Sequence, residues 1–266
     1  MELVENVVIV GSTPVIYVKS INAIVFADSH LGFEEEMARH GLYLPNYQLK
    51  KLLEILNRVF KEVKPKRIII AGDVKHCFSS LSRQERYELS ELFNYLTSIT
   101  SEVIVVRGNH DNYLPLIARK YNIEIVRDYI IEKGILITHG HKDMDLDNID
   151  FRVLVMGHEH PSISLRDELG CTVKFSCYLI APIMDGDRKV VILPASGIYQ
   201  SGTSITLDKS NYLSPIIKKY VDLENAKPYI IDEDLGVVEL PELKAIQDLI
   251  QQYVIQQFLP TPLGQA

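Results

Sequence analysis

The stretch VLVMGHEHPS, from Val153 to Ser162, joins a short apolar run to two histidines that flank a glutamate. The apolar run is typical of a buried β-strand. If that strand continued, His158 and His160 would share one face of a sheet, and Glu159 would point to the other face. Core packing gives no reason for two imidazoles on one face, so we expect the segment after the strand to carry chemistry.

The same pattern, a β-branched run followed at once by Asp, His or Asn, occurs four more times upstream. The four units are NAIVFADSH, RIIIAGDVKH, EVIVVRGNHD and GILITHGH. Of the 8 histidines in the chain, only His40 lies outside the five units. In α/β sheets ligands gather beyond the carboxyl ends of the strands, so we expect the five units to meet at one edge of an α/β fold.

Amphipathic helices separate the first three units. Apolar residues at steps of three and four follow Asn46, which we interpret as the N-cap of a helix that ends before Pro65. Ser82 and Glu85 have the spacing of a capping box and predict the start of a second helix. The acidic run Glu34–Glu36 is typical of a first helical turn, where carboxylates interact favourably with the helix dipole.

The two ends of the chain give simpler predictions. Val7–Val10 and Val15–Val18 are predicted to form a hairpin. An apolar stripe from Leu243 to Phe258 predicts a last helix that packs on the protein's own core, with a homodimer interface as the alternative. No linker composition marks a boundary, so we expect residues 1–266 to form a single domain with a frayed tail from about residue 259.

The composition is that of an ordinary globular protein, with 47% apolar and 24% charged residues and a net charge of −7. No apolar run approaches the ~20 residues that span a bilayer, and the N-terminus lacks a signal-type basic region, so we expect a cytoplasmic protein without membrane association. The cysteines Cys77, Cys171 and Cys177 lack metal-ligand spacing, which argues against a thiolate zinc site. The net charge gives no general attraction to nucleic acid, which would need a local patch or a bound metal.

The polar residues of the five units predict a metal site. Seven histidines gathered with Asp28, Asp73, Asn109 and Asp111 need compensating charge or hydrogen bonds, which divalent cations supply. Imidazole, carboxylate and amide ligands without thiolate favour Mn, Fe, Zn, Ni or Co over Ca or Mg. The candidate ligands exceed the needs of one cation, so we expect two metals that share a bridging carboxylate, with Asp73 as the candidate bridge.

Together these motifs resemble the signature of the calcineurin-like metallophosphoesterases, in the same order, over residues 28–160. The motifs are D-x-H (Asp28 and His30), G-D (Gly72 and Asp73), G-N-H-D (Gly108 to Asp111), H-G-H (His139 to His141) and G-H-x-H (Gly157 to His160). Each motif alone is weak, but the complete set in order is specific. The resemblance implies a four-layer αββα sandwich, in which two mixed β-sheets lie between helices.

The resemblance also implies a role for each residue. One metal would bind Asp28, His30 and His160, the other would bind Asn109, His139 and His158, and Asp73 would bridge them. A hydroxide held between the metals would attack phosphorus, while His110 contacts the phosphate and assists the leaving group. Glu159 would then be only a spacer. His141, where the family often has glycine, is expected to lie behind the ligands.

One position departs from the phosphoprotein phosphatases, in which the G-D motif continues to an acid that orients the catalytic histidine. Here that position is His76. A histidine there resembles the nuclease subunit of the double-strand-break repair machinery, in which two histidines flank the scissile phosphate. The first unit also resembles a small prokaryotic family of predicted phosphoesterases related to that nuclease, some of them encoded beside DNA ligases.

The sequence therefore predicts a metal-dependent phosphoric ester hydrolase with Mn²⁺ as the favoured cofactor. His76 favours a phosphodiesterase or nuclease, with DNA or RNA ends as candidate substrates and a DNA-repair protein as a candidate partner. A phosphomonoesterase acting on small molecules or phosphoproteins is the alternative enzyme. A non-catalytic metal-binding interaction scaffold is the alternative class, which the complete ligand set and His110 disfavour.

Overall fold

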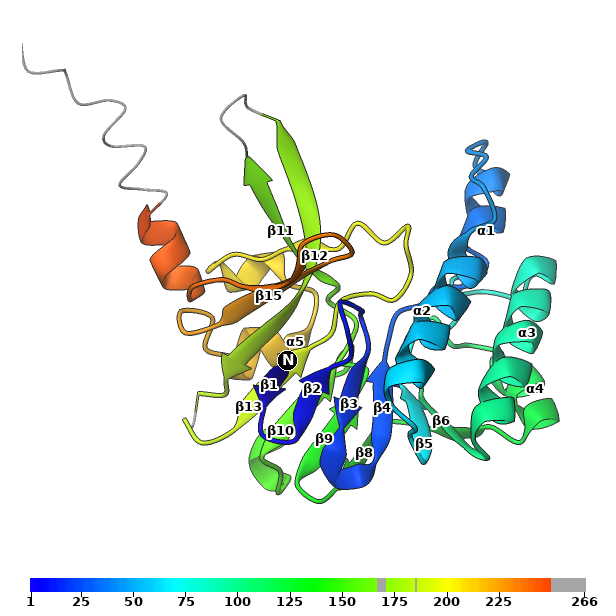
Figure 1. Ribbon diagram of the computed structural model, residues 1–266, viewed down its shortest axis with the longest axis horizontal. Coiled ribbons are helices and arrows are strands. Elements are labelled where there is room, and N and C mark those ends of the chain that lie inside the picture. Colours follow the sequence, from blue (N-terminus) through cyan, green and yellow to red (C-terminus); the bar gives the residue numbers. More distant parts are fainter. Residues whose placement is uncertain (167–170, 185, 250–266) are drawn as a thin grey trace, which may run out of the picture.

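The computed structural model describes residues 1–166, 171–184 and 186–249 of the chain. Two mixed β-sheets pack face to face at the centre, and helices cover their outer faces (Figure 1). This is the four-layer αββα arrangement that the sequence predicts.

The first sheet has seven strands, whose spatial order follows the chain. They are β1 (Glu2–Val4), β2 (Val7–Ile9), β3 (Ile16–Val18), β4 (Ala23–Phe26), β5 (Arg67–Ile70), β6 (Glu102–Val106) and β7 (Glu124–Val126). Neighbours pair antiparallel up to β4 and parallel from β4 onward. The predicted N-terminal hairpin is confirmed as β2 and β3, with Val7 opposite Val18.

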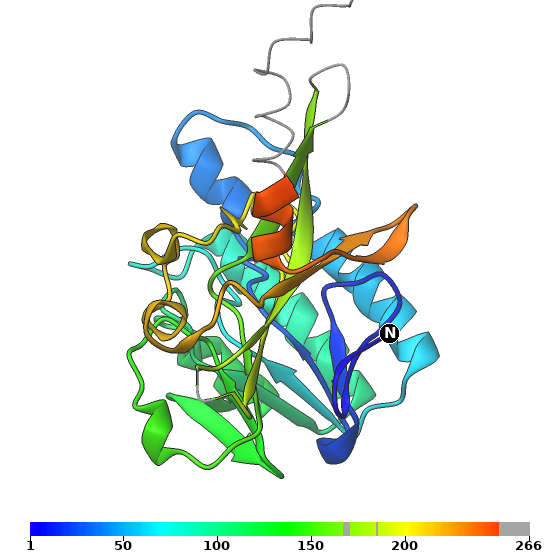
Figure 2. The same cartoon turned by 90° about the vertical axis from the view of Figure 1, so that its left-hand side faces the viewer.

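The second sheet has nine strands. They are β8 (Tyr129–Glu132), β9 (Ile135–Thr138), β10 (Val153–Met156), β11 (Pro161–Arg166), β12 (Thr172–Pro182), β13 (Lys189–Ile192), β14 (Thr203–Ser204), β15 (Lys227–Asp232) and β16 (Gly236–Glu239). Strand β10 lies between β9 and β13 and is parallel to both. Strands β11 and β12 form a ribbon that extends away from the two packed sheets (Figure 2).

Strand alternation divides the core into layers. In β4, Val25 faces the second sheet, whereas Phe26 packs against the helices of the first sheet. In β10, Val155 faces the first sheet, whereas Met156 packs on the outer side of the second. Both faces of these strands are buried, which explains why they read as continuous apolar runs.

The helices are short apart from two. Helices α2 (Gln48–Glu62), α3 (Arg83–Ile99) and α4 (Pro115–Ala118) pack on the first sheet, α5 (Pro215–Tyr220) packs on the second, and α1 (Phe33–Arg39) follows the first polar loop. Helices α2, α3 and α4 lie on the same side of the first sheet, away from the second sheet (Figure 1).

The helix caps confirm one prediction and correct another. Ser82 Oγ accepts a hydrogen bond from Glu85 N at 3.1 Å, and the Glu85 carboxylate accepts one from Ser82 N at 2.7 Å, so the capping box is present. The predicted cap at Asn46 is wrong, because the helix begins one residue later without a capping side chain of its own. The carboxylate of Glu34 accepts from Gln48 N at 2.9 Å instead, so an acid from α1 caps the first turn of α2.

The C-terminal stripe packs on the protein's own core where the structure describes it. Residues 243–249 are helical, Leu243 is buried in the core outside the second sheet, and Ile246 packs beside it. The rest of the stripe and the predicted frayed tail lie outside the described residues. None of the helices described has the length and hydrophobicity that a membrane crossing requires.

Candidate active site

The five polar segments meet at one edge, as predicted. They follow β4, β5 and β6 in the first sheet and β9 and β10 in the second. Within the first sheet, Asp28 N donates to Gly72 O and His30 N donates to Asp73 O, each at 3.0 Å. Between the sheets, His158 N donates to Asp28 Oδ2 at 2.9 Å. Backbone and side-chain hydrogen bonds therefore join loops that are far apart in the sequence.

Left-handed backbone places the side chains in this edge. The φ angle is 58° at Asp28, 43° at His30, 51° at Asp73, 71° at His158 and 48° at His160. Residues with a Cβ rarely adopt this region, at a cost of ~1–3 kcal/mol each, and such strain concentrates at functional sites. The turn after β10 thus breaks the alternation of a strand, and both of its histidines enter the site.

Two glycines allow the loops to approach one another. A Cβ on Gly108 would lie 2.1 Å from Asp73 Oδ1, and a Cβ on Gly157 would lie 2.5 Å from Asp28 Oδ2. Neither distance is compatible with a side chain. The glycines of the G-N-H-D and G-H-x-H motifs are therefore required by the close packing of the two carboxylates.

The first predicted ligand group is brought together. Ligand atoms of Asp28, His30 and His160 all lie within 4.8 Å of one another. His160 Nε2 is 3.1 Å from Asp28 Oδ1 and 3.4 Å from His30 Nε2. Asp28 Oδ1 is buried and makes no well-formed hydrogen bond to the residues that the structure describes, although His160 lies close to it. A buried carboxylate oxygen that lacks hydrogen-bond partners has lone pairs free to bind a cation.

The second predicted group lies beside the first. Ligand atoms of Asp73, His139 and His158 lie within 4.8 Å of one another, and Asn109 Oδ1 is 3.1 Å from His139 Nε2. His139 Nδ1 is 2.9 Å from Ala71 O, so this nitrogen donates to the carbonyl. That hydrogen bond directs Nε2 at the site, where its lone pair can bind a cation once the ring is neutral, as in metal-binding histidines.

Asp73 lies between the two groups. Its Oδ2 is 3.2 Å from His139 Nε2 and 3.9 Å from His30 Nε2. Its Oδ1 accepts a hydrogen bond from His110 N at 2.8 Å, which fixes the carboxylate. One carboxylate oxygen therefore faces imidazoles from both predicted ligand groups.

The electrostatics of the site follow from burial and these two carboxylates. Burial lowers the pKa of His30 to about 3 and, together with His139, lowers the pKa of His158 to about 4. Burial also acts to lower the pKa of His139, but Asp73 and Asp28 outweigh it and raise that pKa to about 9. Neutral imidazole is the metal-binding form, so a cation at His139 would compete with a proton for Nε2.

Asp111, the last residue of the G-N-H-D motif, binds the backbone of the loops around it. Its Oδ2 accepts from Asp73 N and Gly108 N at 2.8 Å, and its Oδ1 accepts from Val74 N at 2.9 Å. Burial, with Asp73 as the next cause, raises the pKa of Asp111 to about 6. This residue holds the second and third polar loops together.

The two predicted catalytic histidines lie next to each other at the side of the first ligand group. The rings of His76 and His110 are stacked, with centroids 5.4 Å apart. His110 Nδ1 donates to His76 O, and His76 Nδ1 is 3.3 Å from His30 Nδ1. The half-exposed ring of Phe78 covers His110 with a centroid distance of 3.7 Å. The ring of His76 thus lies against the rings of both His30 and His110.

Glu159 differs in role from the sequence prediction, whereas His141 lies where it was expected. Glu159 is more than a spacer, because its buried carboxylate accepts hydrogen bonds from Leu213 N and Ser214 N at 3.0 Å. It therefore connects the loop after β10 to the segment before α5, a contact that no local sequence pattern predicts. His141 packs its ring 5.2 Å from that of His139, behind the predicted ligand, and its Nδ1 is buried without a hydrogen-bond partner.

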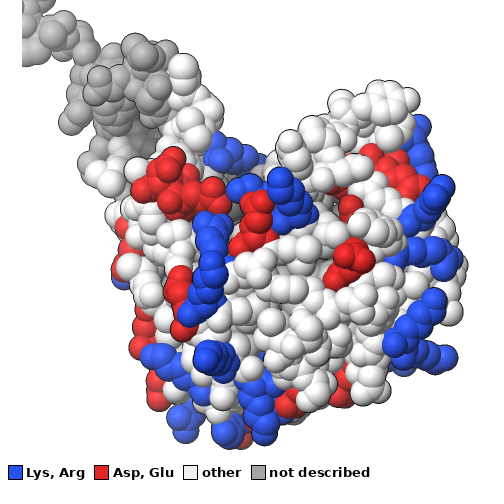
Figure 3. Space-filling view, turned by 45° about the vertical axis from the view of Figure 1, so that its right-hand side comes forward, with Lys and Arg blue, Asp and Glu red and all other residues white. Residues whose placement is uncertain are grey.

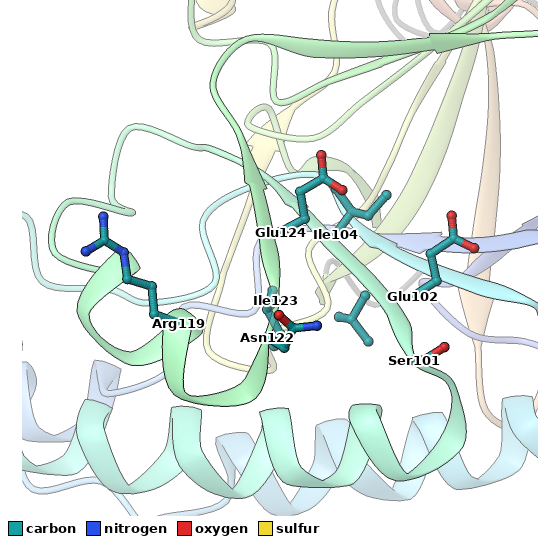
Figure 4. Close-up of a pocket in the computed structure, with 8 residues that line it drawn as sticks. Ser101, Glu102, Ile104, Arg119, Asn122, Ile123 and Glu124 are labelled. Atoms are coloured by element: carbon teal, nitrogen blue, oxygen red, sulfur yellow. The ribbon is translucent and has the colours of Figure 1, made fainter.

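A cavity of about 320 Å³ opens at this site, and its lining includes His30, Asp73, Asn109, His110, His158 and His160. A second cavity, of about 410 Å³, lies at the other edge of the first sheet, where β6 and β7 begin (Figure 4). Glu102 and Glu124 line it, and Arg119 is its one basic lining residue. Two carboxylates disfavour a phosphoester there, so the cavity with the histidines is the candidate active site.

The comparison with protein families agrees with this chemistry. Residues 21–185 match the family model of the calcineurin-like phosphoesterases. The chain belongs to that family. It is accordingly a metal-dependent phosphoric ester hydrolase, and its buried, poorly bonded Asp28 Oδ1 together with the imidazole donors fits the divalent cations that the family implies.

One solved structure in particular shares the fold of this calcineurin-like phosphoesterase. The nuclease MPE of Pseudomonas putida has a TM-score of 0.60 at 20% sequence identity, covering 86% of this chain and 92% of that one. The phosphoesterase Yfce of Escherichia coli has a TM-score of 0.36 at 18% identity, covering 70% of this chain and 83% of that one. None of the curated proteins matches the sequence of this chain.

The buried carboxylate of Glu159 generates a stability prediction. Glu159→Gln keeps the size of the side chain but removes its charge, and the new NH₂ group replaces Oε1, which accepts a hydrogen bond from Leu213 N at 3.1 Å, with a donor. The remaining amide oxygen is a weaker acceptor than a carboxylate for the N–H groups of Leu213 and Ser214. We expect the free energy of unfolding to fall by about 1–3 kcal/mol, measured by urea titration. The matched control is Glu224→Gln at an exposed ion pair, which should change stability far less. Equal stability of both variants would contradict the anchoring role.

Proposed function

We propose that this protein is a binuclear phosphodiesterase that acts on single-stranded or frayed nucleic acid, with Mn²⁺ as its favoured cofactor. The observation that supports two metals is the position of Asp73 between two ligand groups. Asp28, His30 and His160 would hold one ion, Asn109, His139 and His158 the other, and Asp73 would bridge them. Such ions activate a water molecule as nucleophile and neutralise charge on the phosphate oxygens.

His110 would act on the leaving group. Its Nδ1–H is engaged by the carbonyl oxygen of His76, so Nε2 is the atom that can hold or release a proton in the cavity. Asp73 Oδ2 lies 3.8 Å from this Nε2, so the nitrogen lies beside the predicted metal site. A proton moved from Nε2 to the departing oxygen avoids an alkoxide in water.

His76 is the residue that favours diesters. A diester brings one negative charge and a poorer leaving group than most monoester model substrates, so a second imidazole beside His110 has more to contribute. The neighbouring aromatic residues favour nucleic acid, because unpaired bases stack on exposed rings. Phe78 is half exposed above His110, and Phe33 lies between His76 and Tyr199, stacked on the latter with centroids 5.7 Å apart.

The surface supports weak rather than tight binding. Figure 3 shows a face on which basic and acidic side chains are interspersed, and the net charge of the chain is −7. Nucleic-acid affinity depends largely on basic contacts to phosphates. We therefore propose salt-sensitive binding to single strands, nicks or short ends, with tight duplex binding only when a DNA-repair partner supplies it. The fold shared with a bacterial nuclease is compatible with this substrate class.

The bridging role of Asp73 can be tested by metal content. Asp73→Asn should abolish turnover and weaken retention of both metals, because the amide is a poorer bridge than a carboxylate. Elemental analysis after equilibration with Mn²⁺ measures this, with the exposed Asp147→Asn as matched control. A single metal per wild-type chain under saturating Mn²⁺ would count decisively against the binuclear site.

The leaving-group role of His110 predicts a selective loss. His110→Ala should keep its metal content and lower kcat by ~10²–10⁴, with a smaller loss for esters that have good leaving groups. His40→Ala, at a well-exposed histidine, is the control. The readout is the dependence of kcat on the pKa of the leaving group. Equal losses for good and poor leaving groups would rule out proton donation by His110.

The preference for diesters is tested with two chromogenic substrates. We expect wild type to have a higher kcat/KM for bis-p-nitrophenyl phosphate than for p-nitrophenyl phosphate, and His76→Asp to lower that ratio. If wild type favours the monoester, or if the variant leaves the ratio unchanged, the phosphatase alternative replaces the diesterase proposal. Absence of turnover with either ester in the presence of Mn²⁺ would favour the interaction scaffold.

A further inference from the structure

A polar pocket adjoins the candidate active site on the side of Asn109. It has a volume of about 300 Å³, and its basic lining residues are Arg107, Arg127 and Lys142. Asn109 lines both this pocket and the active-site cavity, and its Oδ1 is 3.1 Å from His139 Nε2. The pocket is therefore a direct neighbour of the predicted metal ligands.

The topology explains why three cations gather there. Arg107 follows β6, Arg127 follows β7 and Lys142 comes four residues after β9, so all three lie at the carboxyl ends of their strands. Arg107 N donates to Val126 O at 2.8 Å, which joins the ends of β6 and β7. The same edge that gathers the metal ligands thus gathers the basic side chains.

The charge of the pocket is positive in the part of the chain that the structure describes. Lys142 pairs with the carboxylate of Asp128 at 2.6 Å. Arg107 Nη2 donates to the neutral Asn112 Oδ1 at 2.6 Å, and neither it nor Arg127 lies within ion-pair distance of a described carboxylate. Three cations face one carboxylate, although the chain as a whole is acidic.

We infer that this pocket binds a second phosphate group of the substrate, the backbone phosphate next to the one that is hydrolysed. Guanidinium groups match phosphate oxygens in geometry and keep their charge at every physiological pH. A phosphate held by Arg107 and Arg127 would fix the register of the strand, while the neighbouring diester lies in the active-site cavity. This subsite rests on the proposed diesterase function. The metal ligands would bind only the scissile phosphate, whereas the subsite would distinguish a polymer from a small diester.

The test compares substrates with one and two phosphates. Thymidylyl-thymidine offers only the scissile diester, whereas its 5′-phosphorylated and 3′-phosphorylated forms add a second phosphate on one side or the other. We expect one of the two forms to have a kcat/KM about tenfold above that of the unphosphorylated dinucleotide. Arg127→Gln and Arg107→Gln should each remove most of that gain. Arg127 is exposed, so its substitution is compatible with folding.

The matched control is Lys64→Gln, an exposed lysine just before β5, at the opposite edge of the first sheet. It removes the same charge and should keep the full gain. The subsite would be overturned if neither the 5′-phosphate nor the 3′-phosphate raised kcat/KM of the wild-type enzyme. An equal gain in the wild type and in both arginine variants would also overturn it. A third result would overturn it as well: inorganic phosphate inhibits the wild type more than Arg127→Gln, but a second phosphate on the substrate brings no gain. The pocket would then bind a free anion and not the substrate.

A binding measurement separates this inference from the function on which it rests. Fluorescence anisotropy with a labelled hexathymidylate in EDTA requires neither metal nor turnover. Arg127→Gln should lower the slope of log affinity against log salt by about one, and Lys64→Gln should not. If wild type hydrolyses no diester but shows this difference, the anion subsite stands and the diesterase proposal fails. An unchanged slope in Arg127→Gln would refute the subsite even in an active diesterase.

Discussion

The hydrogen bond from His158 N to Asp28 Oδ2 is the contact on which the site depends, because it joins the two sheets at the edge where all five polar loops end. One oxygen of this buried carboxylate positions a loop of the opposite sheet, and the other faces His160. The same residue therefore serves the fold and the candidate metal site. Gly157 is required beside it, because any side chain would displace the carboxylate.

Much of this arrangement is predictable from sequence because it is local. Buried strands appear as apolar runs, and each candidate ligand follows such a run directly, so parallel pairing brings the ligands together. The capping box of Ser82 is likewise a local pattern. The surplus of candidate ligands and the family resemblance both predicted Asp73 as the bridging carboxylate, and the distances are compatible with that position.

Contacts between distant segments were not predictable in this way. Glu34 has the sequence context of a first-turn acid, yet it is buried and accepts hydrogen bonds from Gln48 N and Gln84 Nε2. Glu159 holds a segment more than fifty residues away, and its neighbours in sequence carry no sign of this. Buried backbone N–H groups need an acceptor, which a carboxylate can supply. Which N–H groups lack one depends on how the loops meet in space, and not on the local sequence.

The division of candidate ligands between the sheets has a thermodynamic consequence. Asp28, His30, Asp73 and Asn109 belong to loops of the first sheet, whereas His139, His158 and His160 belong to loops of the second. A cation that both loops hold would act as a reversible cross-link between the two halves of the chain. Its binding energy would add to the free energy of unfolding by mass action. Chelation would therefore lower the stability of the whole sandwich as well as stop hydrolysis.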